Sequence, residues 1–260
     1  MKAIVMSCDM YHCMTEHMIL KYNSSWPDNP FVFRVPWNDQ YPNHHEDRFG
    51  KKIELIKTNS AFKQTFHQLT KDLDDHEWVY WCSDDKYIID IGVEKANQTL
   101  EFVQSIQDPN IINVCFHRVR RIKETSEIKY GLGRGLPPLQ IPFQNLNFIE
   151  HYSTINNWLH QFFRVGALRE FWSQLPEPEK HKASSLDRYV KRLNGHRLVL
   201  DHNICTYGES SYKSVITNNC LRSAQQLSIS IPEHFLPKNR DSILNSIPSN
   251  ISDGSGSIII

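Results

Sequence analysis

The first 116 residues alternate between short apolar runs and stretches in which apolar residues recur at helical spacing. Strands are predicted at residues 2–8, 31–35, 52–56, 77–82 and 111–116, and helices at 60–73 and 93–103. Strands and helices in alternation are typical of a parallel sheet that carries helices on both faces. We therefore predict an α/β fold with a mostly parallel central sheet flanked by helices, in which ligands bind beyond the carboxyl ends of the strands.

The order of elements becomes less regular after residue 116. Helices are predicted at residues 165–175 and 184–193, and a short strand at 197–200. The sequence contains no internal repeat, and its length suits one large domain, so residues 1–245 are expected to form a single domain. Residues 246–260 mix proline, serine, glycine and asparagine, and we expect them to be a flexible tail.

Composition narrows the class of protein. Lys+Arg and Asp+Glu both number 29, so the formal net charge is +0, and the basic surplus that is usual in nucleic-acid-binding proteins is absent. No run approaches the roughly 18 apolar residues that a membrane span requires. The six cysteines contain no C-x-x-C spacing, which disfavours a structural zinc site. The apolar run at residues 3–6 is too short for a signal peptide. Together these features lead us to expect a cytoplasmic protein with no nucleic-acid partner and no membrane span.

An aromatic and β-branched run at residues 77–82 leads directly into two adjacent carboxylates, Asp84 and Asp85. If this run is the fourth strand of the sheet, both acids stand at its carboxyl end, where ligands bind in α/β sheets. Carboxylate oxygens are ligands that Mg²⁺ and Mn²⁺ prefer, and such a cation stabilises the charge of a diphosphate leaving group. Ser-Asp-Asp is also ordinary turn chemistry, but its position after the strand favours a functional role.

A hydrophobic strand that ends in an acidic pair resembles the D-x-D-type motif of nucleotide-sugar-dependent glycosyltransferases with the Rossmann-like GT-A fold. The segment Ser83-Asp84-Asp85 is a variant, because Ser83 replaces the first acid. The resemblance implies that Asp85 is a direct metal ligand and that Asp84 contacts the ribose or the metal. It also implies that residues 1–116 are a nucleotide-sugar-binding half and residues 117–245 an acceptor-side half.

The same resemblance gives roles to four further residues. The end of the first strand touches the nucleoside in this fold, so Ser7 and Asp9 are candidate nucleotide contacts, although Asp9 equally suits a turn or a helix N-cap. Asp187 is the candidate general base, because inverting members place a carboxylate at the start of an acceptor-side helix. Ser184 and Asp187 also resemble a helix capping box. His202 is a candidate additional metal ligand, and imidazole would favour Mn²⁺ over Mg²⁺.

The sequence thus favours a metal-dependent glycosyltransferase, and the availability of Asp187 as a base favours inversion of configuration at the anomeric carbon. Its predicted cofactor is Mn²⁺ or Mg²⁺, its donor a UDP or GDP sugar, and its acceptor a glycan or another hydroxyl compound. Two alternatives stay open. A nucleotidyltransferase usually has a glycine-rich, basic loop after the first strand, whereas residues 7–12 here read SCDMYH. A non-catalytic nucleotide- or sugar-binding module of the same fold would differ only in turnover.

Overall fold

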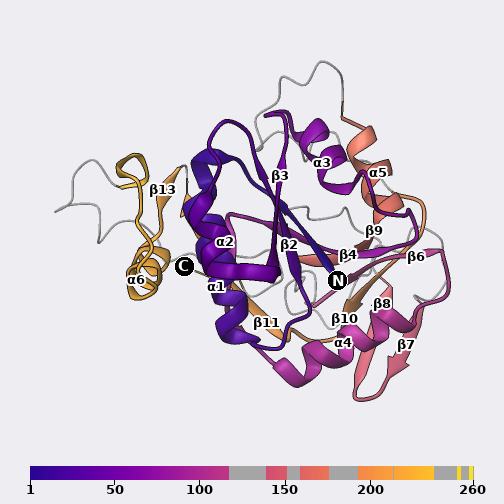
Figure 1. Cartoon of the computed structure of the whole chain (residues 1–260). Helices are drawn as coiled ribbons and strands as arrows, with labels where there is room; N and C mark the ends of the chain where they lie inside the picture. Colours follow the sequence, from indigo (N-terminus) through magenta and orange to yellow (C-terminus); the bar gives the residue numbers. More distant parts are fainter. Residues whose placement is uncertain are drawn as a thin grey trace.

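The computed structural model describes residues 1–116, 139–150, 159–175, 193–212, 214–236, 251–252 and 258–259. Its centre is a nine-stranded sheet in the order β3-β2-β1-β4-β9-β6-β10-β8-β7 (Figure 1). The strands β3, β2, β1 and β4 are parallel neighbours, and β6 pairs parallel with β10. The strand β9 lies antiparallel between β4 and β6, and β8 and β7 extend the far edge in antiparallel fashion. The predicted α/β class is confirmed, with a sheet that is parallel around β1 and mixed beyond β4.

The strands of the main sheet are β1 (Lys2–Met6), β2 (Val32–Trp37), β3 (Ile53–Lys57), β4 (Trp78–Ser83), β6 (Ile111–Cys115), β7 (Gln140–Phe143), β8 (Leu146–Glu150), β9 (Gln161–Arg164) and β10 (His196–Leu200). The helices are α1 (His12–Ser25), α2 (Asn43–Phe49), α3 (Phe62–Thr70), α4 (Val93–Ser105), α5 (Val165–Ser173) and α6 (Asn218–Gln226). The five predicted strands of the first half, both its predicted helices, the helix at 165–175 and the strand at 197–200 are all present. The predicted helix at 184–193 lies almost wholly outside the described residues.

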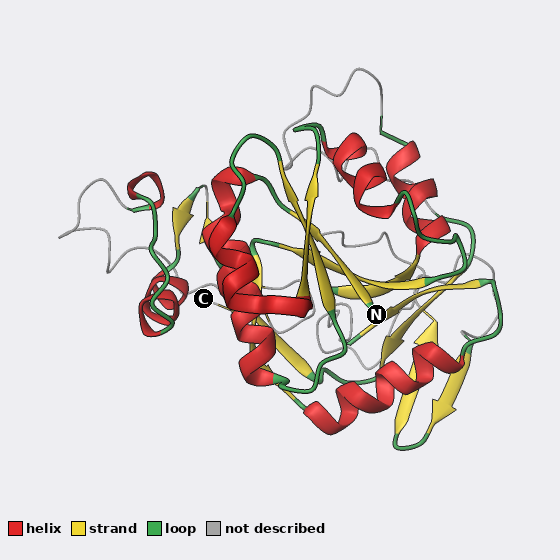
Figure 2. Cartoon of the chain, in the orientation of Figure 1, coloured by secondary structure: helices red, strands yellow, loops and turns green. Residues whose placement is uncertain are grey.

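Helices cover both faces of the sheet (Figure 2). Successive side chains of β1 enter two separate cores, with Ala3 and Val5 in one and Ile4 and Met6 in the other. Helices α1 and α4 supply buried residues to the first core, and α3 and α5 to the second. A strand that is buried on both faces must be apolar at every position, which explains the continuous apolar runs of the sequence.

A second, four-stranded sheet in the order β15-β14-β11-β5 packs beside the main one. The strand β5 (Lys86–Ile91) follows the acidic pair and pairs antiparallel with β11 (Cys205–Glu209), which comes from the second half of the chain. The strands β14 (Ile251–Ser252) and β15 (Ile258–Ile259) extend this sheet from within the predicted tail. A short hairpin of β12 (Ser211–Tyr212) and β13 (Val215–Ile216) follows β11.

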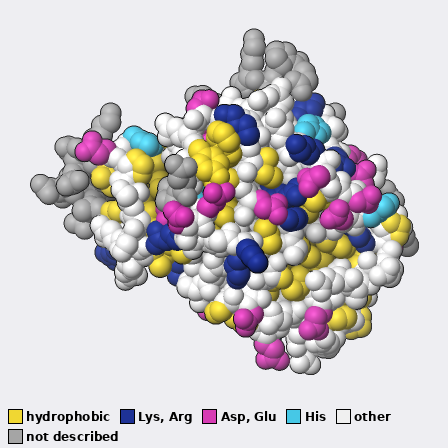
Figure 3. All heavy atoms as spheres, viewed as in Figure 1, with side chains coloured by type: hydrophobic (Ala, Val, Ile, Leu, Met, Phe, Trp, Pro, Cys, Tyr) yellow, Lys and Arg dark blue, Asp and Glu magenta, His cyan; other side chains and the backbone are white. Residues whose placement is uncertain are grey.

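Charged side chains of both signs are mixed over the surface. On the face shown in Figure 3, lysine and arginine side chains are interspersed with aspartate and glutamate. This mixture agrees with the formal net charge of +0. Within the described part of the chain, none of the helices has the length and apolar character needed to cross a membrane.

Candidate active site

A cavity of about 590 Å³ opens at the carboxyl ends of β1, β2 and β4. Its lining comes from both halves of the chain: Met6, Ser7, Cys8, Tyr11, Asn38, Ser60, Phe62, Thr65, Ser83, Asp84, Asp85, Lys86, Glu209, Ser211 and Ser214. This is the edge at which parallel α/β sheets bind their ligands, and the volume lies in the range of small-molecule sites. The structure therefore brings Ser7, Asp84 and Asp85, three of the predicted site residues, into one cavity.

The acidic pair occupies the tight connection between β4 and β5. The Ser83 hydroxyl donates to Oδ1 of Asp85, and the amide of Asp84 donates to the carbonyl of Met6 on β1 at 3.4 Å. Burial and the neighbouring charge of Asp85 raise the pKa of Asp84 to about 8, against the opposing effect of a hydrogen bond with Ser7. A positive charge placed beside the two carboxylates would favour their ionised forms.

Lys86 and Glu209 complete the acidic side of the cavity. Opposite each other in the β5–β11 ladder, they form an ion pair in which Nζ of Lys86 lies 2.9 Å from Oε1 of Glu209 and 3.7 Å from Oδ2 of Asp85. Burial of Lys86 lowers its pKa, but attraction by Asp85 and Glu209 outweighs this, so the pKa lies above its ordinary value. Sequence reasoning missed both residues, because Glu209 is 123 positions away and only the strand register brings it close.

A chain of buried hydrogen bonds contacts the connection between β4 and β5 through the carbonyl group of Ser83. Nε2 of His160 lies 2.9 Å from the carbonyl oxygen of Ser83, and Nδ1 lies 2.6 Å from the hydroxyl of Tyr22 on α1. Since a carbonyl oxygen can only accept, Nε2 carries the proton and Nδ1 accepts from Tyr22. The chain continues from Tyr22 to Tyr80 at 2.9 Å and to Tyr207 on β11 at 3.3 Å. Burial lowers the pKa of His160 to about 4, so the ring is neutral at pH 7.

The two predicted contacts at the end of β1 have different surroundings. Ser7 lines the cavity and accepts a hydrogen bond from Thr15 at 2.8 Å. Asp9 instead turns its carboxylate to the loop after β2, where it accepts from the amides of residues 38, 39 and 40 at 2.7, 2.6 and 2.8 Å. Burial would raise the pKa of Asp9, but these amide donors outweigh it and lower the pKa. Asp9 thus holds a loop that reaches the cavity through Asn38, and its predicted nucleotide contact stays a prediction.

His202 lies at the opposite end of the β5–β11 ladder from the acidic pair. Residues 86 and 209 pair at one end of this ladder and residues 91 and 205 at the other, so about 17 Å of strand separates the ends. Nδ1 of His202 lies 2.5 Å from Asp201, and Nε2 lies 2.9 Å from Nζ of Lys95. The ring therefore has partners on both nitrogens and does not line the cavity. The structure does not bring His202 to the predicted metal site.

Asp187, the predicted general base, lies outside the described residues. Among the described residues, no group of three or more His, Cys, Asp or Glu side chains is arranged to hold a metal ion. Mg²⁺ sites beside nucleotides commonly need only one or two carboxylates, because phosphate oxygens and water complete the coordination. Asp84 and Asp85 are such a pair of neighbouring oxygen donors in the cavity lining, so this donor set fits a divalent cation.

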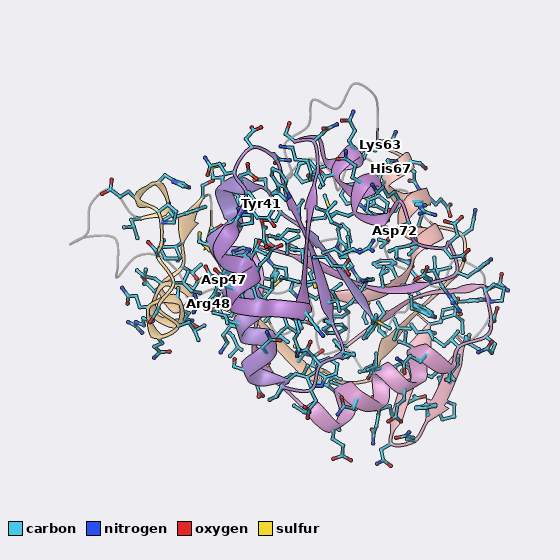
Figure 4. The ribbon with its side chains drawn as sticks, in the orientation of Figure 1. Tyr41, Asp47, Arg48, Lys63, His67 and Asp72 are labelled. Atoms are coloured by element: carbon cyan, nitrogen blue, oxygen red, sulfur yellow. The ribbon has the colours of Figure 1, made fainter. Side chains whose placement is uncertain are left out.

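A second cavity, of about 460 Å³, has Asp9 and Met10 in its lining. Its lining includes Tyr41 and Arg48, which are seen near α2 in Figure 4. Arg48 donates to Glu16 on α1 and to the carbonyl of Leu227 at 2.5 Å. Asp9 and Gln40 line this cavity, whereas Cys8 and Asn38 line the first, so the two cavities are neighbours.

No family model matches the chain, and no curated protein matches it. Among solved structures, it is similar to the galactosyltransferase LgtC in complex with donor and acceptor sugar analogs, at 12% identity and a TM-score of 0.40, over 75% of this chain and 68% of that one. It is similar to the glycosyltransferase GlyE of Streptococcus pneumoniae, at 11% identity and a TM-score of 0.40, over 91% of this chain and 52% of GlyE.

A putative glucose-1-phosphate thymidylyltransferase of Bacillus anthracis is also similar, at 12% identity and a TM-score of 0.40, over 90% of this chain and 98% of that one. Sequence identities this low carry no residue roles from one protein to another. The chain is thus similar in structure to solved glycosyltransferases and to a solved nucleotidyltransferase, at a level that concerns the fold alone.

Proposed function

We propose that this chain is a glycosyltransferase that moves a sugar from a nucleotide-diphosphate sugar to an acceptor hydroxyl group. The observation that carries the proposal is the convergence of Ser7, Asp84 and Asp85 in one cavity at the carboxyl edge of a parallel sheet. The cavity is large enough for a small-molecule ligand. Its lining includes the carboxyl groups of Asp84 and Asp85, which are the oxygen donors that a divalent cation prefers.

In this proposal Asp85 holds Mn²⁺ or Mg²⁺, and Asp84 contacts the cation or the ribose. A divalent cation bound there would stabilise the negative charge of the departing diphosphate. Ser83 orients Asp85 through its hydrogen bond, and His160 holds the connection in place through the carbonyl of Ser83. The nucleoside, uridine or guanosine, lies near Ser7.

Asp187 is proposed to take the proton of the acceptor hydroxyl, with inversion at the anomeric carbon. General-base removal costs roughly 10²- to 10⁴-fold in rate. Asp187→Asn should therefore lower transfer by that factor while nucleotide binding and melting temperature stay close to those of the native protein. Near-normal transfer by Asp187→Asn would mean that the residue only caps a helix.

A nucleotidyltransferase is the second candidate of the same fold. It has to neutralise a nucleoside triphosphate, which calls for several positive charges around the phosphates. Among the described residues that line the cavity, Lys86 is the one that carries a positive charge. This lining favours use of a nucleotide sugar over its synthesis. A non-catalytic binding module differs from both by the absence of donor turnover.

The test is calorimetry with UDP and GDP in the presence of Mn²⁺, Mg²⁺ or EDTA, followed by an assay of donor hydrolysis. We expect one diphosphate to bind, and to bind more tightly with the cation. Equal affinity in EDTA would remove the cation from the proposal. The absence of binding for both diphosphates under all conditions would contradict the proposed function, and binding without turnover would favour the non-catalytic module.

A further inference from the structure

We propose that Lys86 is a substrate-contacting residue that binds the diphosphate of the nucleotide ligand and stabilises it as a leaving group. This inference rests on the proposed function and deepens it. Lys86 stands directly after the acidic pair, at the first position of β5, and it lines the cavity. Its side chain is only 9% exposed, so its charge is turned into the protein rather than out to solvent.

The ammonium group of Lys86 keeps donor capacity for a ligand. It carries three N–H donors. Oε1 of Glu209 accepts at 2.9 Å, whereas Oδ2 of Asp85 lies at 3.7 Å, beyond hydrogen-bond distance. Glu209 therefore holds Nζ in position, and further donors remain for a phosphate oxygen that enters the cavity.

The charge balance of the cavity calls for such a contact. The described lining holds three carboxyl groups, those of Asp84, Asp85 and Glu209, and one ammonium group, that of Lys86. Carboxylates repel a diphosphate, so a cation at the acidic pair and an ammonium beside it together make the site attractive to an anion. Lys86 and Glu209 both line the cavity, and their ion pair holds the ammonium group beside Asp85.

During transfer the bond between the anomeric carbon and the diphosphate oxygen breaks, and its electron pair stays on the diphosphate. The acceptor oxygen forms the new bond to the carbon and loses its proton to a base, the role proposed for Asp187. Lys86 keeps its own proton throughout and donates a hydrogen bond to the diphosphate as its charge grows. A preorganised donor of this kind acts most strongly where charge develops.

Calorimetry with UDP and GDP, at a fixed Mn²⁺ concentration, tests this role on four proteins: the native chain, Lys86→Arg, the double variant Lys86→Met with Glu209→Gln, and Lys95→Met. The double variant removes both members of the ion pair, so no buried charge is left alone. Lys95→Met is the matched control, because Lys95 lies beside His202 at the other end of the ladder. Each variant is first checked for a cooperative melting transition.

We expect the double variant to bind the diphosphate about 10- to 100-fold more weakly, as is usual for a lost charge-assisted hydrogen bond. Lys86→Arg should retain most of the affinity, and Lys95→Met should match the native protein. Native-like affinity in the double variant would overturn the role of Lys86 and leave the proposed function standing. If the native chain binds neither diphosphate, the proposed function fails, and the role of Lys86 fails with it.

Discussion

The two ends of the β5–β11 ladder carry similar side chains in different surroundings. At the cavity end Lys86 pairs with Glu209, and their side chains are 9% and 18% exposed. At the other end His202 lies between Asp201 and Lys95, and the side chains of His202 and Asp201 are 39% and 41% exposed. Exposed pairs contribute little, because water screens them, whereas removal of one buried partner leaves an uncompensated charge. The position along one ladder thus decides which charged groups are shielded from water and which are screened by it.

The largest expected effect is on the free energy of unfolding, in a comparison of Lys86 and Lys95 from the two ends of the β5–β11 ladder. Lys86→Met should lower the free energy of unfolding by about 3–5 kcal/mol, because it leaves Glu209 buried beside Asp85 without its cation. Lys95→Met should change it by no more than about 0.5 kcal/mol, since it alters an exposed group. Urea unfolding of both variants measures the difference. Similar losses in the two variants would break the contrast between the ends.

The next largest effect is on Mn²⁺-dependent nucleotide binding, in a comparison of Asp85→Asn with His202→Gln. Substitution of a residue that only supports a metal ligand typically lowers metal affinity roughly 10- to 100-fold. Loss of Asp85, a direct ligand in the proposed site, should therefore weaken Mn²⁺-dependent nucleotide binding by at least about 100-fold. His202→Gln should leave it unchanged, because the ring lies at the far end of the ladder. Calorimetry with Mn²⁺ and UDP or GDP provides the measurement. A clear loss in His202→Gln would restore the sequence-based prediction for this residue.

The third prediction concerns the dependence of stability on pH and the buried side chain of His17. Burial, with a smaller effect of Lys21, lowers the pKa of His17 to about 4, and Nε2 of this ring lies 2.9 Å from the hydroxyl of Ser223 on α6. An unfolded histidine titrates near pH 6.5, so the unfolded chain binds more protons below that pH. The contribution of His17 to stability is therefore complete above about pH 6.5 and is lost as the pH falls towards about 4.

When one group binds a proton only in the unfolded chain, the free energy of unfolding changes by about 1.4 kcal/mol per pH unit. His17→Gln should make the fall in stability between pH 6.5 and 4.5 shallower than in the native protein by roughly that amount. Unfolding measured at several pH values tests the difference. An unchanged slope in His17→Gln would show that His17 takes up its proton equally in the folded and the unfolded protein.

The smallest effect comes from the hydrogen-bond chain beneath the acidic pair. Tyr22→Phe removes the hydroxyl that donates to His160 and accepts from Tyr80, and it should cost about 1 kcal/mol of stability. It should also weaken nucleotide binding slightly, because His160 then holds the carbonyl of Ser83 less firmly. Thermal unfolding and calorimetry measure both. A loss of stability without any change in binding would limit the chain to a structural role.

The sequence predicts the strands of the first half well, because each is an apolar run buried on both faces and is recognisable locally. Helix α1 was not predicted, because burial also removes the local pattern by which a helix is recognised. Most of its surface is buried, including Met14, Thr15, Glu16 and His17, so it lacks the polar stripe that marks an amphipathic helix. The strand β9 is also absent from the prediction, because it consists of four residues that run directly into α5.

The acidic pair at the carboxyl end of β4 was determined by the sequence alone, since a strand followed at once by two carboxylates is a pattern of neighbouring residues. Which distant side chains join the pair was decided by the tertiary structure. Pairing of β11 with β5 places Glu209 beside Lys86 and carries His202 to the far end. A shift of register by one residue would turn each side chain to the other face of the sheet. Such pairings depend on packing between segments more than one hundred residues apart, and no local pattern contains that information.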